Sequence, residues 1–139
     1  AARGDLPAVH PRYEAGHAIF KRLAETDPSS AQGQGDLVAS YQRLATLETR
    51  SGNFAGARLH LDTALALLAH RLAEGGEAVK NALFLRLLAA AIEAKAGDAT
   101  ASAAHVAEAR RLLAILDARG EFQGDAKLDQ LRAQLNPRP

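Results

Sequence analysis

The fold is decided by the stretch from residue 36 to residue 71, which reads DLVASYQRLATLETRSGNFAGARLHLDTALALLAHR. Leu37 and Tyr41 stand four residues apart, and further large side chains follow at intervals of three, a spacing that gathers them on one helical face. Gly52 can adopt the left-handed conformation that ends a helix, and Asn53 can cap the next helix by accepting a hydrogen bond from a free N–H group. The stretch therefore predicts two antiparallel helices joined at Gly52.

The second predicted helix alternates small and large residues. The alternating positions are Ala57, Leu61, Ala64, Leu65 and Leu68. Alanine lets two backbones approach closely, so the partner of this helix should be another helix. A similar pattern follows Gly97, which lies 45 residues beyond Gly52, with Ser102, Val106 and Ala109 at the same spacing. The helical hairpin is therefore repeated with a period of 45 residues.

This pattern resembles the tetratricopeptide repeat, a unit of about 34 residues made of two antiparallel helices. The residues that carry the resemblance in the first full unit are Tyr41, Leu44, Ala45, Gly52, Asn53, Phe54, Ala57, Leu61 and Ala64. The second unit is degenerate, and the resemblance spans roughly residues 13–118. It implies an all-α fold in which hairpins stack as a right-handed superhelix, with about 2.5 repeats of longer-than-usual, bacterial-type period and a C-terminal capping helix.

Both full units depart from the family at one matching position. Glu48 and Glu93 stand near a place where the family usually has a large apolar residue, close to the seam between helices. An ionised carboxylate there is costly unless it is paired. Two interpretations remain open: each glutamate reaches an arginine such as Arg58 or the solvent, or it contacts a ligand. A catalytic acid/base pair would need a shorter separation than adjacent repeats usually provide.

Local signals predict the helix boundaries. We expect helices near 11–25, 36–50, 54–73, 77–96, 99–118 and 125–135, all within a repeat domain at 11–135, with a flexible segment at 1–10 and a tail at 136–139. Residues 32–35 read QGQG, and the two glycines disfavour a helix by about 1 kcal/mol each relative to alanine. The chain contains 32 alanines and only 4% aromatic residues, a composition that favours helix over strand.

The charge pattern excludes some classes of function. The chain has 17 basic and 16 acidic residues, unsegregated along the sequence, so it lacks the basic stripe of a nucleic-acid binder. The stretch closest to an apolar run, residues 83–92, is interrupted by Arg86 and is too short to cross a bilayer. Cysteine is absent, which leaves both the cytoplasm and the periplasm open, and we favour the cytoplasm. Methionine is also absent, and arginine outnumbers lysine by 13 to 4, so we expect a fragment of a longer bacterial protein.

No catalytic or metal-binding motif emerges from the sequence. The histidines are His10, His17, His60, His70 and His105. They fall mostly on separate predicted helices, and none forms the helical pair that binds zinc, so we interpret them as solvated or half-buried side chains. Ser40, Ser51 and Ser102 lack the strand-to-helix turn that exposes a nucleophile. We therefore expect no enzyme activity, no cofactor and no metal site.

The resemblance also implies a function. Tetratricopeptide arrays bind peptides in a groove lined by the first helix of each hairpin. Carried over by position, the groove residues are Ala39, Gln42, Thr46, Thr49 and Arg50 from the first full unit, and Phe84, Leu87, Ala91, Ala94 and Lys95 from the second. We expect a protein-interaction module of a larger bacterial signalling or regulatory protein, such as a Ser/Thr kinase. The alternatives are a self-association or ligand-sensing domain, and an ordinary solvated face for the ten residues.

Overall fold

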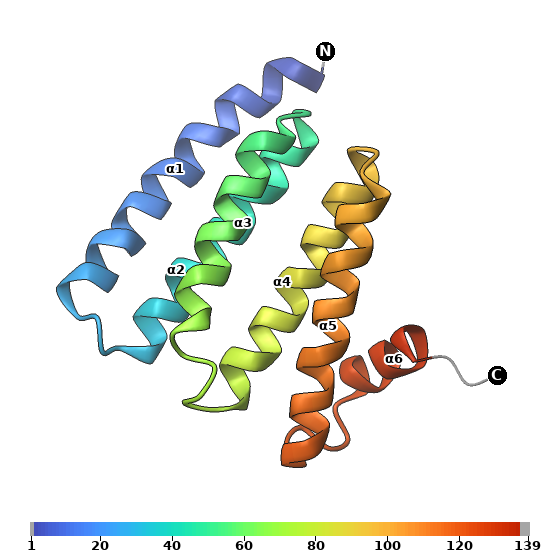
Figure 1. Cartoon of the computed structure of the whole chain (residues 1–139). Helices are drawn as coiled ribbons and strands as arrows, with labels where there is room; N and C mark the ends of the chain where they lie inside the picture. Colours follow the sequence, from blue (N-terminus) through green and yellow to red (C-terminus); the bar gives the residue numbers. More distant parts are fainter. Residues whose placement is uncertain (1, 137–139) are drawn as a thin grey trace. The chain divides into compact units, whose positions relative to one another are not determined.

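The structure is a computed structural model that describes residues 2–136, with side chains from residue 12 onward. Its helices are α1 (Ala2–Thr26), α2 (Ala31–Arg50), α3 (Phe54–Ala69), α4 (Gly76–Lys95), α5 (Ala99–Arg119) and α6 (Ala126–Leu135), shown in Figure 1. No strand occurs in residues 2–136, so the predicted all-α class is confirmed. The chain divides into two compact units, Ala1–Leu67 and Leu68–Pro139, which are described in turn.

In the first unit, α2 packs against both α1 and α3. The α1–α2 pair is antiparallel (Figure 1), and the ring of Tyr41 on α2 lies 6.0 Å from the ring of His60 on α3. The buried apolar side chains of the unit are Ala24, Leu37, Val38, Leu44, Ala45, Leu47, Ala57, Leu61 and Ala64. Most of them belong to α2 and α3, so the hairpin predicted around Gly52 forms the core of this unit.

The turn at Gly52 ends α2 in the way its sequence predicts. Gly52 has a φ of 82°, and the N–H of Asn53 donates to the carbonyl of Glu48 at 2.8 Å. The second turn repeats this geometry: Gly97 has a φ of 87°, and the N–H of Asp98 donates to the carbonyl of Glu93 at 2.8 Å. A residue with a side chain would be strained at either glycine, so both turns depend on the left-handed conformation.

Helix α2 begins earlier than its sequence suggests. It starts at Ala31 and passes through the QGQG segment, which was expected to be non-helical. The side chain of Ser30 accepts a hydrogen bond from the N–H of Gly33 at 3.0 Å, which caps the helix. This cap, together with the packing of α2 in the unit, outweighs the low helix propensity of the two glycines.

Two other boundaries differ from expectation. Helix α1 begins at Ala2, whereas the sequence predicted a flexible segment over residues 1–10. Helix α3 ends at Ala69 rather than near residue 73, and the chain continues as a turn in which the N–H of Arg71 donates to the carbonyl of Leu68. The residues after α3 therefore close short i to i−3 turns in place of helical bonds. Residues 137–139, most of the predicted tail, lie outside the described residues.

The second unit is built on the α4–α5 hairpin. The hydroxyl of Ser102 on α5 donates to the carbonyl of Ala90 on α4 at 2.8 Å, which ties the helices together where small residues let them approach. Asp98 caps α5 by accepting from the N–H of Ala101. The buried apolar side chains of this unit on α4 and α5 are Val79, Ala82, Leu83, Leu85, Ala89, Ala90, Ile92, Ala109, Leu112, Leu113 and Leu116.

Helix α6 folds back onto this hairpin after a tight connection. Phe122 in the connection has a φ of 60°, a strained value for a residue with a large side chain, and the ammonium of Lys80 lies 4.7 Å from the centre of its ring. Leu128 and Leu135 of α6 are buried. A helix is therefore present where the sequence predicted one near residues 125–135, with Asp125 as its N-cap.

Candidate functional site

A shallow depression of about 360 Å³ lies along α2 in the first unit. The side chains that line it are Tyr13, Ala39, Gln42, Arg43, Thr46, Leu47 and Arg50. Four of the five residues nominated from the first repeat are in this set. The fifth, Thr49, is not; its hydroxyl donates to the carbonyl of Ala45 at 2.7 Å. The helical spacing of the nominated residues thus places most of them around one concavity.

Sequence reasoning missed two members of this lining. Tyr13 comes from α1, and no pattern in the sequence indicates how α1 lies on α2. Arg43 adds a second guanidinium to that of Arg50, one heptad away on the same face of α2. The Arg43 guanidinium lies 6.0 Å from the centre of the Phe20 ring. An arginine one turn from a nominated position could have been found by extending the helical face.

The depression carries a local positive charge. Its two charged side chains are arginines, both are exposed, and neither forms an ion pair within the described part of the chain. The hydroxyl of Thr46 donates to the carbonyl of Gln42 at 3.0 Å, so its oxygen remains able to accept a hydrogen bond. The exposed amide of Gln42 can both donate and accept. The arrangement suits an anionic, hydrogen-bonding segment of a ligand.

Glu48 lies beside the first turn and is only 8% exposed. Its carboxylate accepts a hydrogen bond from the side-chain amide of Asn53, whose oxygen accepts from the N–H of Gly56 at 3.0 Å. A Cβ atom at Gly56 would come within 2.6 Å of the Asn53 amide nitrogen, so a larger residue there would displace the side chain of Asn53. Asn53 is a partner that the sequence did not suggest. Burial near the seam is confirmed for Glu48 and for Glu93, which is 6% exposed.

The five residues nominated on α4 are not gathered in the same way. Phe84 lies under the ammonium of Lys127, 5.0 Å from the ring centre, and is therefore partly covered by α6. Ala91 and Lys95 are exposed and Leu87 is half-buried. Only Ala94 contributes to a described depression, and that depression opens beside α5 rather than along α4.

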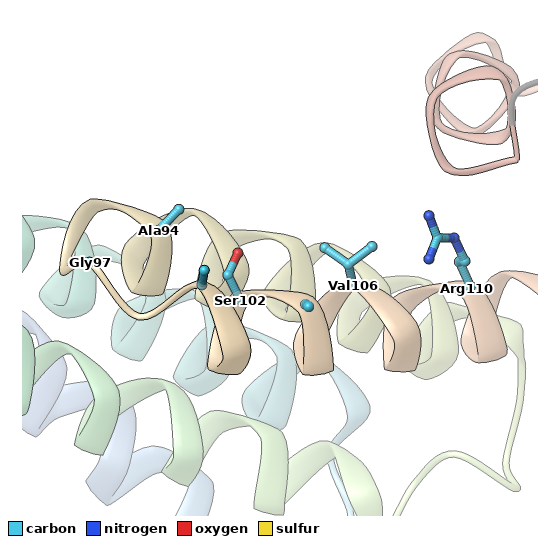
Figure 2. A pocket seen from close by; sticks show the side chains of 7 residues that line it. Ala94, Gly97, Ser102, Val106 and Arg110 are labelled. Atoms are coloured by element: carbon cyan, nitrogen blue, oxygen red, sulfur yellow. The ribbon is translucent and has the colours of Figure 1, made fainter.

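This second depression has a volume of about 500 Å³ and an apolar character (Figure 2). It is lined by Ala94, Gly97, Ala99, Ser102, Ala103, Val106 and Arg110. Arg110 stands at one end, where its Nε donates to the carbonyl of Leu135 of α6 at 2.8 Å. The lining is mostly small side chains, and its one charged group, Arg110, is already hydrogen-bonded to Leu135. This depression therefore offers apolar surface for packing but few polar groups for binding a ligand.

The histidines are half-buried or exposed among the described side chains, as expected, but two of them are brought together. His17 of α1 packs edge-on against Tyr41, with ring centres 4.3 Å apart, and His60 approaches the same tyrosine from α3. Burial, and then the nearby charge of His60, lower the pKa of His17 below its ordinary value of 6.5. His105 instead contacts Arg86 across the α4–α5 seam, with a separation of 3.1 Å between its Nδ1 and the guanidinium.

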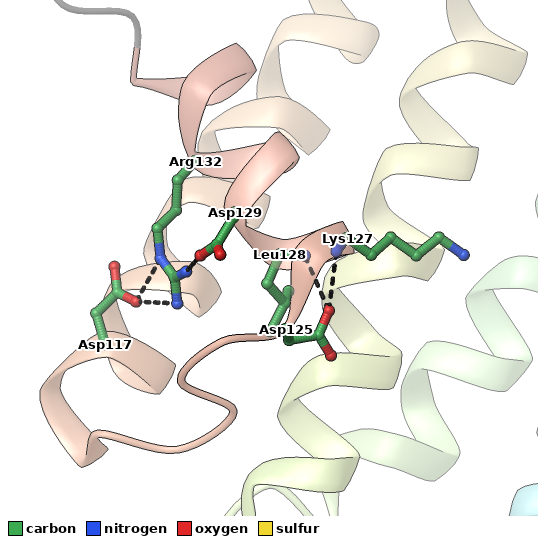
Figure 3. A network of polar contacts seen from close by, with 6 residues as sticks. All are labelled: Asp117, Asp125, Lys127, Leu128, Asp129 and Arg132. Atoms are coloured by element: carbon green, nitrogen blue, oxygen red, sulfur yellow. Dashed lines mark hydrogen bonds and ion pairs between the residues drawn. The ribbon is translucent and has the colours of Figure 1, made fainter.

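Helix α6 is held by a polar network, part of which is drawn in Figure 3. Asp125 accepts from the N–H groups of Lys127 and Leu128 and from the ammonium of Lys80 at 2.9 Å. These contacts, led by that of Lys80, lower the pKa of Asp125. At the other side, Arg132 pairs with Asp117 of α5 at 2.7 Å. The network explains the position of α6 and has no reacting group.

Within residues 12–136, no group of three or more histidine, aspartate or glutamate side chains is placed to hold a metal ion. None of the described helices combines the length and apolarity that a bilayer crossing needs. Comparison with family models, curated proteins and solved structures yields no match for this chain. The depression on α2 is therefore the site best supported by its own geometry.

Proposed function

We propose that this chain is a non-catalytic protein-interaction module that binds an acidic peptide segment in the depression along α2. The observation that carries the proposal is the gathering of Ala39, Gln42, Thr46 and Arg50 around one concavity, joined by Arg43. Two guanidinium groups without described ion pairs can form charge-assisted hydrogen bonds with carboxylates. Gln42 offers an amide to the peptide backbone.

We further propose that the hairpins are tetratricopeptide-like units that stack as a superhelix. Support comes from the two turns, which share a left-handed glycine, a hydrogen bond from the following residue and a buried glutamate at an offset of 45 residues. In such an array the depression would belong to the ligand-binding face. We also propose that the module belongs to a larger signalling or regulatory protein.

The test is selection of peptides from a random displayed library, followed by fluorescence anisotropy with the best peptide. We expect enrichment of acidic peptides, and we expect Arg50→Glu to weaken binding by about tenfold, which corresponds to about 1.4 kcal/mol. Arg43→Glu should act in the same direction. Raising the salt concentration should weaken binding because the contacts are exposed.

The matched control is Arg22→Glu, which makes the same charge change at an exposed position of α1 outside the depression. It should leave affinity within about twofold of the wild type, since it lies off the binding face. Circular dichroism of each variant shows whether the helices persist. Peptides that bind equally well to wild type, Arg43→Glu and Arg50→Glu would contradict the proposal, as would a selection that enriches no acidic sequence.

A further inference from the structure

Two large aliphatic side chains stand together on the exposed face of α1. Ile19 and Leu23 are one helical turn apart, and they are 54% and 58% exposed. A single exposed leucine is ordinary on a protein surface, but two neighbours in line form a contiguous apolar surface. Removal of that surface from water is favourable, so a matching apolar surface would be attracted to it.

An acidic residue continues this face beyond the end of α1. The N–H of Asp27 donates to the carbonyl of Leu23 at 3.1 Å, so Asp27 follows Leu23 by one more helical turn. Asp27 is exposed, and its Oδ1 accepts from the hydroxyl of Ser29 at 2.8 Å. A carboxylate has further acceptor sites for a second donor. Ile19, Leu23 and Asp27, here named the α1 stripe, therefore present two apolar groups and then a negative charge over about 12 Å.

The depression beside α5 has the complementary order of groups at the same spacing. Ser102, Val106 and Arg110 follow one another at intervals of four residues, as do the three members of the α1 stripe. Figure 2 shows these three residues in a row along α5. The Ser102 hydroxyl already donates to a carbonyl of α4. Ala99 and Ala103 complete a low apolar floor, and Arg110 places a positive charge at its end.

Arg110 can bind a carboxylate while it holds α6. Its Nε donates to the carbonyl of Leu135 at 2.8 Å, and its two Nη groups carry further hydrogens that can be donated. The residue is exposed, so a carboxylate can approach it from the depression. Such a contact would be a charge-assisted hydrogen bond. Because one bond already orients the guanidinium, a second contact costs less side-chain freedom.

We propose that copies of this chain associate head to tail, with the α1 stripe of one copy seated in the α5 depression of the next. When the two helices lie parallel, Leu23 meets Val106 and Asp27 meets Arg110 in the same register, so apolar and charged groups are matched together. The two surfaces differ, so the contact is heterologous and each added copy leaves a stripe and a depression open. Neither surface shares a residue with the lining of the depression on α2, so the association is independent of peptide binding.

Sedimentation equilibrium of the full chain tests the association. The contact covers about two helical turns on each copy, far less than the roughly 800 Å² per partner of a stable interface, so about 10 µM to 1 mM protein is needed. The mean mass should rise over this range. Leu23→Glu and Ala103→Glu should each weaken the association by about tenfold or more, because each introduces a charge into an apolar contact.

Each of these variants has a matched control. Leu59→Glu makes the same change as Leu23→Glu at a leucine of α3 that is 67% exposed. Ala107→Glu makes the same change as Ala103→Glu at an exposed alanine of α5 outside the depression. Both controls should leave the association within about twofold of the wild type, since they lie off the proposed contact. Circular dichroism shows whether each variant keeps its helices.

A mixture of the two variants separates a head-to-tail contact from a symmetric one. Leu23→Glu keeps its depression and Ala103→Glu keeps its stripe, so together they should form a heterodimer that neither forms alone. Asp27→Lys, at an exposed position, covers the case in which Leu23→Glu fails to fold. It should weaken the association by about threefold or more and should replace Leu23→Glu in the mixture.

Three results would overturn the proposal. The first is a wild-type chain that stays monomeric up to about 1 mM. The second is an association that folded Leu23→Glu, Asp27→Lys and Ala103→Glu variants leave unchanged. The third is a mixture of stripe and depression variants that remains monomeric although the wild type associates, because a head-to-tail contact requires one intact interface between them.

Discussion

The first and the last helix of this chain are attached in opposite ways. Helix α1 has 25 residues, yet Ile19 and Leu23 are more than half exposed and its specific contact is a histidine–serine hydrogen bond. Helix α6 has only 10 residues, but Leu128 is fully buried and Leu135 nearly so. Among the described side chains, the short helix α6 therefore buries two leucines, whereas residues 12–26 of α1 bury only Ala24.

The comparison teaches that helix length does not measure attachment. A long helix has more internal hydrogen bonds, but isolated helices are marginally stable in water, and most helical stability in proteins comes from the burial and cross-helix contacts that form on docking. Helix α6 combines buried leucines with ion pairs from Lys80 and Asp117. Residues 12–26 of α1 contact α2 instead through the half-buried His17, by a hydrogen bond to Ser40 and by ring packing on Tyr41.

The largest expected effect comes from removing a buried side chain of α6. Leu128→Ala should destabilise the second unit by about 3 kcal/mol, because a fully buried leucine loses its packing and leaves a cavity. The same truncation in α1, Leu23→Ala, should change stability by less than about 0.5 kcal/mol, since that side chain is 58% exposed. Urea unfolding measures both changes. Equal costs for the two variants would contradict the contrast in anchoring.

Removing the N-cap residue of α6, Asp125, should have a smaller effect on the stability of the helix. Asp125→Ala should reduce the hydrogen-exchange protection of α6, because Lys127 and Leu128 lose their N–H acceptor and Lys80 loses its ionic partner. Asp125→Asn should reduce it less, because the amide oxygen can still accept from the two N–H groups. An Asn variant as damaged as the Ala variant would show that the charge, rather than the cap, holds this end of α6.

Acid should weaken the attachment of α6 only at low pH. The pKa of Asp125 is lowered from its ordinary 3.8, chiefly by its contact with Lys80. Its contribution to stability is therefore complete above pH 3.8 and is lost as the pH falls through the lowered value. Between about pH 7 and pH 5, protection of α6 should therefore stay constant. Asp125→Asn removes the acid sensitivity that this carboxylate contributes.

Salt should produce the smallest change. At about 1 M salt the Debye length is about 3 Å, so the exposed pairs that hold α6 are screened. We expect protection of α6 to fall by about two- to threefold, in keeping with the small contribution of exposed ion pairs. Protection of residues 12–26 of α1 should change less, because their contacts with α2 include the ring packing and hydrogen bond of His17, which salt screens little. A larger loss in α1 than in α6 would reverse the comparison.

Most of the secondary structure could be predicted from the sequence because its signals are local. The glycines at 52 and 97 and the caps at Asn53, Asp98 and Asp125 act within a few residues, and the structure places helix boundaries beside each of them. The start of α2 was wrong because the Ser30 cap and packing outweigh the glycines at 33 and 35. The predicted end of α3, near residue 73, was wrong because the chain turns after Ala69, before the apolar pattern in the sequence stops.

The site could be predicted only in part. Helical spacing placed Ala39, Gln42, Thr46 and Arg50 on one face, and they do line one depression. Spacing within α2 could not supply Tyr13, which comes from another helix. On α4 the Lys127 side chain of α6 lies over the nominated Phe84, and the depression that includes Ala94 is lined mostly by α5.

The sequence by itself determined an all-helical chain, the hairpin turns and the caps, because those depend on spacing and on backbone conformations that glycine alone adopts readily. The tertiary structure alone decided which distant side chains meet. The side-chain amide of Asn53 donates to Glu48, and His17 is hydrogen-bonded to Ser40. The guanidinium of Arg110 donates to the carbonyl of Leu135 at the end of α6. Such contacts depend on how helices lie against one another in three dimensions. Helical periodicity predicts which side chains share one face of a helix, but it does not predict which other helix packs against that face.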